Sequence, residues 1–286
     1  MTDLSRLSIV VLHFNTPEIL AECLGRLRRY AMGAEVIVVD TGEPQGARAL
    51  IQQDFPEMKL LCVENFSMAY AVNQGLKRAK GEYLCHMNAD VYVEEGSFAG
   101  LLAALEGDKV GMVGPLARDS NNRLQNLGLF YRWQYRRLIY SQQKAIAVPW
   151  LSGCMQVFKR DLLQELGGLN PSYRFYNEDK EWCLRLRQKG YRCLLVNSPL
   201  THLGGSSTPS AARFSIEGVR GGYLLSLRYY SPFVQWLHRG ICLAYLRLLL
   251  AFQRQETSRE QRLLTMFQEN SYLQSPFGAS LAEDKG

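Results

Sequence analysis

Short apolar runs alternate with amphipathic stretches over the first 115 residues of the chain. Leu7 to Phe14 is apolar and rich in β-branched residues, which is typical of a buried strand. Thr16 and Pro17 come next, and apolar positions from Ile19 to Leu27 recur at helical spacing, so a helix is predicted to begin there. The alternation continues with strands over Glu35 to Val39, Lys59 to Val63, Glu82 to Met87 and Val110 to Val113, and helices over Ala47 to Gln53, Met68 to Lys80 and Ser97 to Leu105. Such a chain is expected to form an α/β domain, with a mostly parallel sheet flanked by helices on both faces.

Polar residues occupy the carboxyl ends of the predicted strands. They are His13, Asn15, Asp40, Asn88 and Asp90, each at the end of an apolar run or just after it. Open α/β sheets bind their ligands in the crevice at this edge. The coincidence predicts a ligand site built from the ends of the first, second and fourth strands.

The rest of the chain is less regular. The stretch 116–160 is predicted as loops and strands with many aromatic residues. A helix is expected over Glu178 to Lys189 and a strand over Tyr191 to Val196, and Phe214 to about Gln255 is helical in pattern. We therefore expect a domain over residues 1–210, a helical extension over 211–255 and a mobile tail over 256–286.

Composition and charge narrow the class of protein. Hydrophobic residues make up 47% and charged residues 21% of the chain, as in ordinary globular enzymes. The net charge of +6 fits an anionic ligand or membrane surface, but the basic residues are dispersed, so no nucleic-acid partner is expected. The apolar stretch from Ile241 to Phe252 is interrupted by Arg247 and is too short to cross a bilayer.

The spacing of the cysteines and the amino-terminal residues indicate the cellular compartment that we expect for the protein. The seven cysteines lie far apart and include no Cys-x-x-Cys pair, which fits neither a disulfide framework nor a zinc site. Residues 1–6 do not lead into the apolar region of a secretory signal. We expect free thiols and a cytoplasmic protein.

Asn88-Ala89-Asp90 carries the first candidate chemistry. A carboxylate that follows a buried strand suits a divalent cation held between the protein and a diphosphate. A cation is useful there because it neutralises the charge of a departing nucleoside diphosphate. The alternative is that Asp90 only caps the following turn, and the tripeptide by itself supports both interpretations.

Glu178 and Asp179 carry the second candidate chemistry. They open a predicted helix, where the helix dipole favours acidic residues whatever their function. The functional interpretation is that one carboxylate removes the proton of an acceptor hydroxyl. Their place after Gly167-Gly168-Leu169 and before Trp182 favours that role over a simple cap.

Taken together, these blocks resemble glycosyltransferase family 2, whose members are inverting enzymes with the GT-A fold. The resemblance extends from about Leu7 to Ser207, with the blocks in the family's order. They are Ser8 to Asn15, Val38-Val39-Asp40, Ala69 to Gly75, Asn88-Ala89-Asp90, Trp150 to Gly153, Gly167-Gly168-Leu169 with Glu178-Asp179, and His202 ahead of Gly205-Ser206. The resemblance implies a Rossmann-like GT-A domain, to which the C-terminal helices are added.

The resemblance also assigns roles at the matching positions. Asp179 corresponds to the catalytic base, and Glu178 is the less favoured candidate for the same role. Asp90 and His202 correspond to ligands of a Mg²⁺ or Mn²⁺ ion. The nucleotide-sugar pocket is expected to include Leu12, His13, Asn15, Asp40, Asn65, Asn73 and Asn88, and the acceptor subsite Trp150 and Gly153. Purely structural roles remain open for His202, Trp150 and the asparagines at 65 and 73.

The implied function is the transfer of a sugar, with inversion at its anomeric carbon, to a hydroxyl of a glycan or lipid-linked acceptor in surface polysaccharide biosynthesis. The donor would be dTDP-rhamnose, a UDP-sugar or a GDP-sugar. Asn88 stands where many members have an aspartate, as in rhamnosyltransferase-like branches, and this favours dTDP-rhamnose. The alternative is a catalytically inactive glycan- or nucleotide-sugar-binding protein with the same fold. The joint presence of acidic residues and a histidine at the matching positions argues against that alternative, namely Asp40, Asp90, Glu178, Asp179 and His202.

Aromatic and basic residues interleave in the C-terminal helical part, for example Tyr229, Trp236, Arg239, Tyr245 and Arg247. This pattern fits a peripheral contact with the inner face of the plasma membrane, next to a lipid-linked acceptor. It fits a helix pair packed on the domain equally well. Both interpretations remain open.

Overall fold

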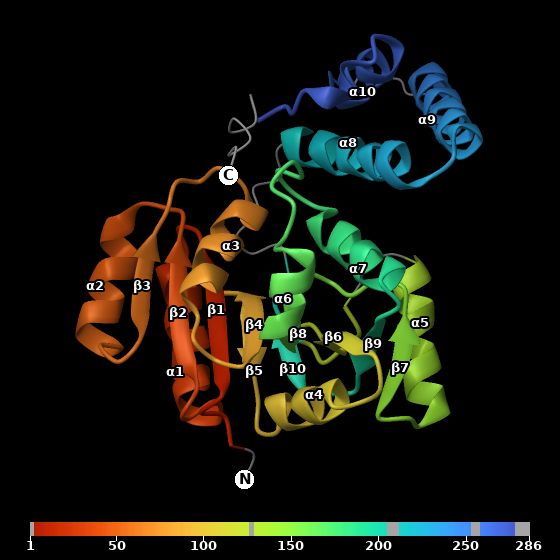
Figure 1. The fold of residues 1–286 in the computed structure, drawn as a ribbon. Coiled ribbons are helices and arrows are strands. Elements are labelled where there is room, and N and C mark those ends of the chain that lie inside the picture. Colours follow the sequence, from red (N-terminus) through yellow and green to blue (C-terminus); the bar gives the residue numbers. More distant parts are fainter. Residues whose placement is uncertain (1–2, 126–128, 205–211, 253–257, 278–286) are drawn as a thin grey trace. The chain divides into compact units, whose positions relative to one another are not determined.

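The computed structural model describes residues 3–125, 129–204, 212–252 and 258–277 (Figure 1). The chain divides into two units. Unit 1 contains Met1–Leu169 and Asp179–Thr208, and unit 2 contains Asn170–Glu178 and Pro209–Gly286. The chain therefore passes from unit 1 into unit 2, returns, and enters unit 2 again.

An eight-stranded sheet forms the centre of unit 1, in the order β3-β2-β1-β4-β8-β6-β9-β7 (Figure 1). Its strands are β1 (Leu7–His13), β2 (Glu35–Asp40), β3 (Lys59–Cys62), β4 (Tyr83–Asn88), β6 (Val110–Pro115), β7 (Ala145–Val148), β8 (Met155–Lys159) and β9 (Arg192–Val196). Strands β1 to β4 are parallel, as are β6 and β9, whereas β8 runs antiparallel to β4 and β6, and β7 to β9. The expected α/β fold with a mostly parallel sheet is confirmed.

Helices cover both faces of this sheet. One apolar core includes α1 (Pro17–Tyr30), α2 (Pro44–Asp54) and α4 (Ser97–Leu105), and the other includes α3 (Met68–Arg78), α5 (Leu129–Ser141), α6 (Arg160–Leu166) and α7 (Glu178–Gln188). Successive side chains of a strand point to opposite faces, so Ile9 and Val11 lie in the first core and Val10 lies in the second. Burial on both faces explains why β1 is apolar throughout.

A second, two-stranded sheet forms where the chain leaves β4. Strand β5 (Val91–Val93) pairs antiparallel with β10 (Leu200–His202), and His202 lies opposite Val91. Asp90 directly precedes β5. This pairing therefore brings Asp90 and His202 together although they are far apart in sequence.

The stretch 116–160 differs from its prediction because it contains the helix α5. Tyr131, Tyr135 and Leu138 are buried, whereas Trp133 and Tyr140 are exposed. The buried positions are three or four residues apart, which is helical spacing. The prediction of loops and strands was wrong here because aromatic residues are common in strands and hid this periodicity.

Unit 2 is mainly helical. It contains α8 (Ala212–Tyr229), α9 (Pro232–Phe252), α10 (Ser258–Gln268) and the short 3₁₀ helix η1 (Ser271–Leu273). Its apolar core includes Tyr223 of α8, Leu246 of α9 and Phe267 of α10. The boundary expected at residue 256 thus falls inside this unit, while residues 253–257 and 278–286 lie outside the described part of the chain.

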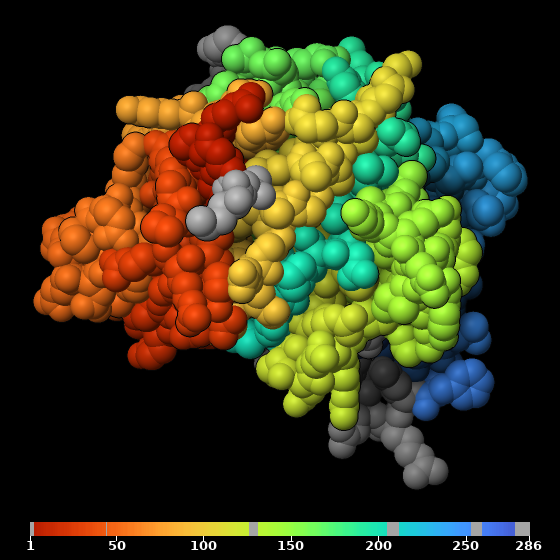
Figure 2. Space-filling model, turned by 90° about the horizontal axis from the view of Figure 1, so that it is seen from below, coloured from red at the N-terminus to blue at the C-terminus, as the bar shows by residue number. Residues whose placement is uncertain are grey.

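Figure 2 shows the molecule from the side on which the amino-terminal segment lies, and the exposed side chains near the start of β1 and β4 are paired with each other or with Glu106. Arg6 pairs with Glu82, and Glu106 accepts hydrogen bonds from Tyr83 Oη (2.7 Å) and Lys159 Nζ (3.0 Å). Exposed pairs of this kind contribute little to stability. The predicted site residues of β1, β2 and β4 stand at the opposite, carboxyl ends of these strands.

Candidate active site

A buried histidine–carboxylate pair lies at the carboxyl ends of β1 and β2. His13 Nδ1 lies 2.9 Å from Asp40 Oδ1. Because His13 Nε2 accepts a hydrogen bond from the Thr16 N–H (3.0 Å), the ring proton lies on Nδ1 and is donated to Asp40. Asp40 Oδ2 is buried as well, and it has no hydrogen-bond partner among the described residues. An acceptor oxygen in this state is suited to a donor group of a bound ligand.

Asn15 fixes the loops after β1 and β2 to each other. Its backbone is left-handed (φ 48°), and its Oδ1 accepts the N–H of Glu43 (2.7 Å). A Cβ at Gly42 would lie 2.0 Å from this oxygen, so a glycine is required there. On the other side of β1, Leu12 lies opposite Asn88 of β4. The structure thus gathers the predicted donor residues of β1, β2 and β4 at one edge of the sheet, and their contact with a nucleotide sugar stays a prediction.

Asn73 lies on α3, and both polar atoms of its side-chain amide bond to the backbone of one residue, Leu169. Its Nδ2 donates to Leu169 O (2.7 Å), and its Oδ1 accepts the Leu169 N–H (2.9 Å). A Cβ at Gly168 would lie 2.2 Å from the same Oδ1, which explains the glycine at that position. Asn65 is exposed on the loop before α3. Donor binding by these two asparagines stays a prediction.

Asp90 and His202 face each other beside the small sheet. His202 Nε2 lies 3.2 Å from Asp90 Oδ1, which is an ion-pair distance, although this oxygen makes no hydrogen bond of good geometry with a described residue. On the other side of the ring, Nδ1 donates to Gln125 Oε1 (2.8 Å). Burial favours the neutral ring, but Cys154 and Asp90 outweigh it and raise the pKa of His202 to about 10. Gly205 and Ser206 of the same block lie outside the described residues.

These two side chains fit part of a divalent-cation site. Asp90 offers a buried carboxylate oxygen without a hydrogen bond, and the bond to Gln125 orients the His202 ring, as outer partners of metal-bound histidines do. Within the described ranges, no group of three or more His, Cys, Asp or Glu side chains forms a complete protein cage. Few protein ligands are needed where a cation is shared with phosphate oxygens. Asp90 and His202 could therefore bind a cation together with a diphosphate, provided that the cation replaces the proton on His202 Nε2.

Asp179 is fixed at the first turn of α7. Its Oδ2 accepts the N–H of Gly153 (2.9 Å), and its Oδ1 accepts the N–H of Lys180 (2.7 Å). Burial raises the pKa of the Asp179 carboxyl above its ordinary value, while the charge of Lys180 and the N–H groups oppose this. A buried carboxylate with a raised pKa is suited to take up a proton. Its neighbour Glu178 is also buried, but belongs to unit 2.

Trp150 and Gly153 lie on the loop between β7 and β8. A Cβ at Gly153 would lie 3.2 Å from Asp179 Cβ, so this loop approaches the carboxylate closely. Trp150 packs edge to face on Tyr131 with ring centroids 4.6 Å apart, and Lys180 Nζ lies 4.9 Å from its ring centroid. The Trp150 indole N–H favours the charged form of Asp179, but makes no hydrogen bond of good geometry with a described residue. Acceptor binding by Trp150 and Gly153 stays a prediction.

Backbone hydrogen bonds connect these groups. The Asn88 N–H donates to Cys154 O (3.0 Å), and Cys154 follows the Gly153 that holds Asp179. The Leu203 N–H donates to Asp90 O (3.0 Å). The end of β4, the loop at Gly153 and the Asp90–His202 pair thus belong to one hydrogen-bonded framework of unit 1.

Three residues of this framework were missed by sequence reasoning. Gln125 is an isolated glutamine in a loop and forms part of no motif. Cys154 has the apolar surroundings that are usual for a buried thiol, and all seven cysteines are free, as expected. Lys180 directly follows the Glu178-Asp179 pair, and this adjacency was the one signal that could have been used.

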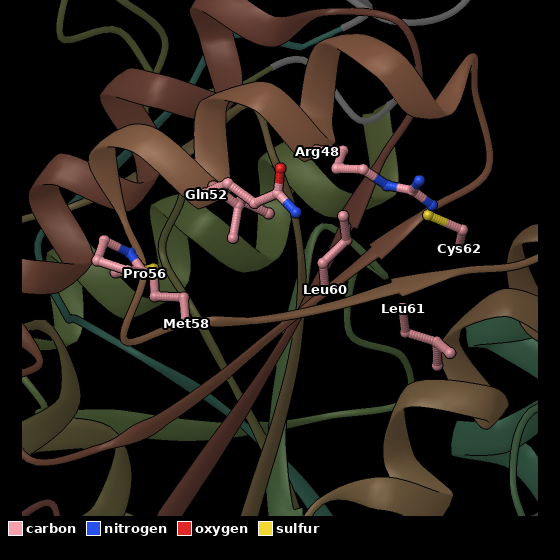
Figure 3. Close-up of a pocket in the computed structure, with 8 residues that line it drawn as sticks. Arg48, Gln52, Pro56, Met58, Leu60, Leu61 and Cys62 are labelled. Atoms are coloured by element: carbon pink, nitrogen blue, oxygen red, sulfur yellow. The ribbon is translucent and has the colours of Figure 1, made fainter.

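A cavity of about 520 Å³ lies elsewhere in unit 1, beside the edge strand β3 (Figure 3). It is lined by residues of α2, β3 and the turn between them, namely Arg48, Ile51, Gln52, Pro56, Met58, Leu60, Leu61 and Cys62. No predicted site residue is among them. The cavity is thus separate from the strand ends at which the donor is expected.

Comparison with known proteins gives a match over the first part of the chain. Residues 8–167 match the model described as "Glycosyl transferase family 2". This range is more than half of the chain, and it includes Asp40 and Asp90 but ends before Asp179 and His202.

A poly-β-1,6-N-acetyl-D-glucosamine synthase of Staphylococcus aureus is similar over part of its length. It is 28% identical over 170 residues, which are 55% of this chain and 40% of the synthase. The chain thus spans less than half the length of this curated relative.

Solved glycosyltransferases share the fold. The mannosyltransferase PcManGT from Pyrobaculum calidifontis, in complex with GDP-Man and Mn²⁺, has a TM-score of 0.59 at 19% identity, covering 94% of this chain and 84% of its own. GalNAc-T7 with UDP, GalNAc and Mn²⁺ has a TM-score of 0.64 at 16% identity, covering 98% of this chain and 60% of its own. At these identities the likeness concerns the fold, which is the expected GT-A fold. On the match of residues 8–167, the chain belongs to glycosyl transferase family 2.

Proposed function

We propose that this protein is an inverting glycosyltransferase that moves a sugar from a nucleoside-diphosphate donor to a hydroxyl of a glycan or lipid-linked acceptor. The observation that carries the proposal is the buried Asp179 carboxylate, which two backbone N–H groups fix and whose pKa burial raises. In a chain of this family, such a group fits the base that activates a hydroxyl. The likeness to a polysaccharide synthase supports a role in surface polysaccharide assembly.

The proposed reaction is a single in-line displacement. The Asp179 carboxylate takes the proton of the acceptor hydroxyl, and the oxygen forms a bond to the anomeric carbon of the donor sugar. The bond between this carbon and the diphosphate oxygen breaks, and its electron pair leaves with the nucleoside diphosphate. Because the acceptor attacks from the face opposite the leaving group, the anomeric configuration inverts.

Asp90 and His202 are proposed to hold a Mg²⁺ or Mn²⁺ ion, whose charge would stabilise the leaving diphosphate. Two solved proteins with this fold were obtained with Mn²⁺ and GDP-Man or UDP, which supports this choice. The buried Asp40 Oδ2 supports a nucleoside site, since it can accept a hydrogen bond from a ribose hydroxyl or a base N–H. On the acceptor side, the buried indole N–H of Trp150 can donate to a sugar hydroxyl.

A thermal-shift screen is expected to identify the donor nucleotide. A ligand that binds only the folded protein stabilises it by about 2.7 kcal/mol at 100 times its Kd, which corresponds to several degrees. We expect one of UDP, GDP and dTDP, and its sugar nucleotide, to raise the melting temperature in the presence of Mn²⁺. Asp40→Asn should reduce this shift because an amide NH₂ then replaces one of the two carboxylate oxygens. This is either Oδ2, which would accept from the ligand, or Oδ1, which accepts from His13. If no nucleotide shifts the wild type, the proposed donor site is wrong.

The second candidate is a protein that binds a nucleotide sugar or glycan without transferring it. Such a protein would show the same thermal shift but no sugar transfer from a labelled donor. The raised pKa of Asp179 favours the enzyme, because binding alone does not require a buried proton acceptor. An assay for glycosyl transfer with the identified donor separates the two candidates.

Helix α9 presents an apolar face to solvent. Leu246 is its buried residue, and exposed apolar side chains recur along it at Phe233, Trp236, Leu237, Ile241, Tyr245, Leu248 and Phe252. The helix carries Arg239 and Arg247 and no acidic residue. None of the helices described is long and apolar enough to cross a membrane. We propose that this face lies on an anionic lipid surface that carries the acceptor.

The protein is expected to float with vesicles that contain phosphatidylglycerol, and less so as salt rises and screens the arginines. Trp236 and Tyr245 are 69% and 60% exposed. The double variant Trp236→Ser, Tyr245→Ser should lower vesicle binding at least roughly tenfold, because burying one large apolar side chain contributes about 1.5–3 kcal/mol. Trp133→Ser is the matched control, since Trp133 is 58% exposed on α5. Equal flotation of both variants and the wild type would exclude α9 as the lipid-binding face.

A further inference from the structure

The segment 170–178 leads directly to Asp179 but belongs to unit 2. Asp179 itself belongs to unit 1, so the chain crosses between the units at the peptide bond after Glu178. The position of a side chain depends on the backbone on both sides of it. Contacts that fix residues 170–178 within unit 2 therefore bear on the proposed base.

A buried ion pair on α8 holds this segment. Glu217 and Arg220 are 0% and 2% exposed, and Arg220 Nε lies 2.7 Å from Glu217 Oε2. Glu217 Oε1 also accepts the N–H of Arg174 (3.0 Å), and Arg220 Nη2 donates to Ser172 O (2.9 Å). Buried charges are costly unless they are paired and hydrogen-bonded. Here two of the partners are backbone groups of the segment, so the pair and the segment fix each other.

Asn177 makes a third connection to α8. Its Nδ2 donates to Gly218 O (2.8 Å). Tyr176 and Asn177 both have left-handed backbones, with φ of 65° and 71°, which residues other than glycine seldom adopt. A Cβ at Gly221 would lie 2.8 Å from Asn177 Nδ2, so α8 approaches the turn closely. Strained conformations of this kind persist where the surrounding structure determines them, and they cluster at functional sites.

We infer that Glu217, Arg220 and Asn177 form a clamp that fixes the turn before Asp179 and thereby directs its carboxylate. They are positioning residues, because they act through the backbone of residues 170–178. The inference rests on the proposed role of Asp179 as base. It goes beyond that role by naming residues that hold the backbone directly before the base.

The first test is Asn177→Gly, which removes the bond to Gly218 but keeps a residue that tolerates a left-handed backbone. We expect kcat to fall roughly 100-fold, since a displacement of about 1 Å at a reacting group has an effect of this size. Donor KM and nucleoside-diphosphate binding should stay unchanged, because the proposed donor residues lie in unit 1. Arg220→Lys is the second variant, and it can be used alone if Asn177→Gly folds poorly. It keeps the charge but loses the planar fork of the guanidinium, so kcat should fall here as well.

The pH profile separates positioning from a general loss of stability. Burial is the largest cause of the raised pKa of Asp179. A looser turn admits water, so this pKa should fall and the acid limb of kcat/KM should move to lower pH. Lys180, whose charge lowers the pKa of Asp179, and Cys183, whose own pKa Asp179 helps to raise, are unchanged in both variants.

Ser226→Ala is the matched control on the same helix. Ser226 is buried, and its Oγ lies 2.5 Å from His238 Nδ1 rather than against the segment. Ser226→Ala should lower the melting temperature, but kcat and the acid limb of the kcat/KM profile should stay as in the wild type. The clamp is excluded if Asn177→Gly and Arg220→Lys behave like Ser226→Ala. If Asp179 is not the base, the result is distinguishable, because Asp179→Asn would then have the turnover of the wild type.

Discussion

Replacing Asp179 by asparagine is expected to lower turnover by roughly 10²–10⁴-fold, which is the usual contribution of a positioned general base. Asparagine has nearly the same size but cannot take up the proton of the acceptor hydroxyl. The fold and nucleotide binding should persist, because the proposed donor residues stand at the ends of β1, β2 and β4. Turnover with the identified donor, together with calorimetric titration of the nucleoside diphosphate, measures both expectations.

Glu178→Gln is the matched control, since it removes the neighbouring carboxylate, and it should keep most of the activity. Normal turnover in Asp179→Asn with a loss in Glu178→Gln would transfer the role of base to Glu178. The wild-type pH profile gives a further check. A base works only when it is deprotonated, so activity falls as pH drops through its pKa. Because burial raises the pKa of Asp179 above 3.8, the acid limb should lie at higher pH than for an ordinary aspartate.

Replacing Asp90 by asparagine should remove the dependence of nucleotide binding on Mn²⁺. The variant keeps the size of the side chain but loses the charge that faces His202. We expect metal-assisted affinity to fall at least roughly tenfold, because outer partners of metal ligands alone contribute about 10–100-fold. Titration of the nucleoside diphosphate with and without Mn²⁺ gives the two affinities.

Gln125→Leu is compared with Asp90→Asn, since it removes only the oxygen that accepts the hydrogen bond from His202 Nδ1. Its effect should have the same direction as that of Asp90→Asn and be smaller. Mn²⁺ dependence retained by Asp90→Asn would mean that another residue holds the cation. A wild type that binds the nucleotide equally well without metal would exclude the cation site altogether.

The first half of unit 1 could be predicted from the sequence because each element carries its own local signal. Leu7–His13 is apolar because both faces of β1 are buried, and Pro17 begins α1 as the pattern indicates. The placing of His13 and Asp40 at one edge follows from parallel strands, whose carboxyl ends meet at the same side of a sheet.

Features that depend on distant contacts could not be predicted in this way. Strand β5 is three residues long, and its pairing with β10 depends on a partner far along the chain. Gln125 supports His202 from a loop without a motif. Residues 170–178 belong to unit 2 and bond to Glu217 and Arg220, and sequence spacing reveals neither feature.

The discontinuity of unit 2 also has a consequence for the synthesis of the protein on the ribosome. Domains fold as units during synthesis, the amino-terminal one first, so unit 1, whose residues end at Thr208, can assemble before most of unit 2 has been made. The turn before Asp179 has to wait, because Arg174 bonds to Glu217 and to Phe277 O (3.4 Å), which are made much later. If the residues have the roles proposed above, a nascent chain would form its nucleotide site before its base is in place. Sugar transfer would then begin only once the helical unit has left the ribosome.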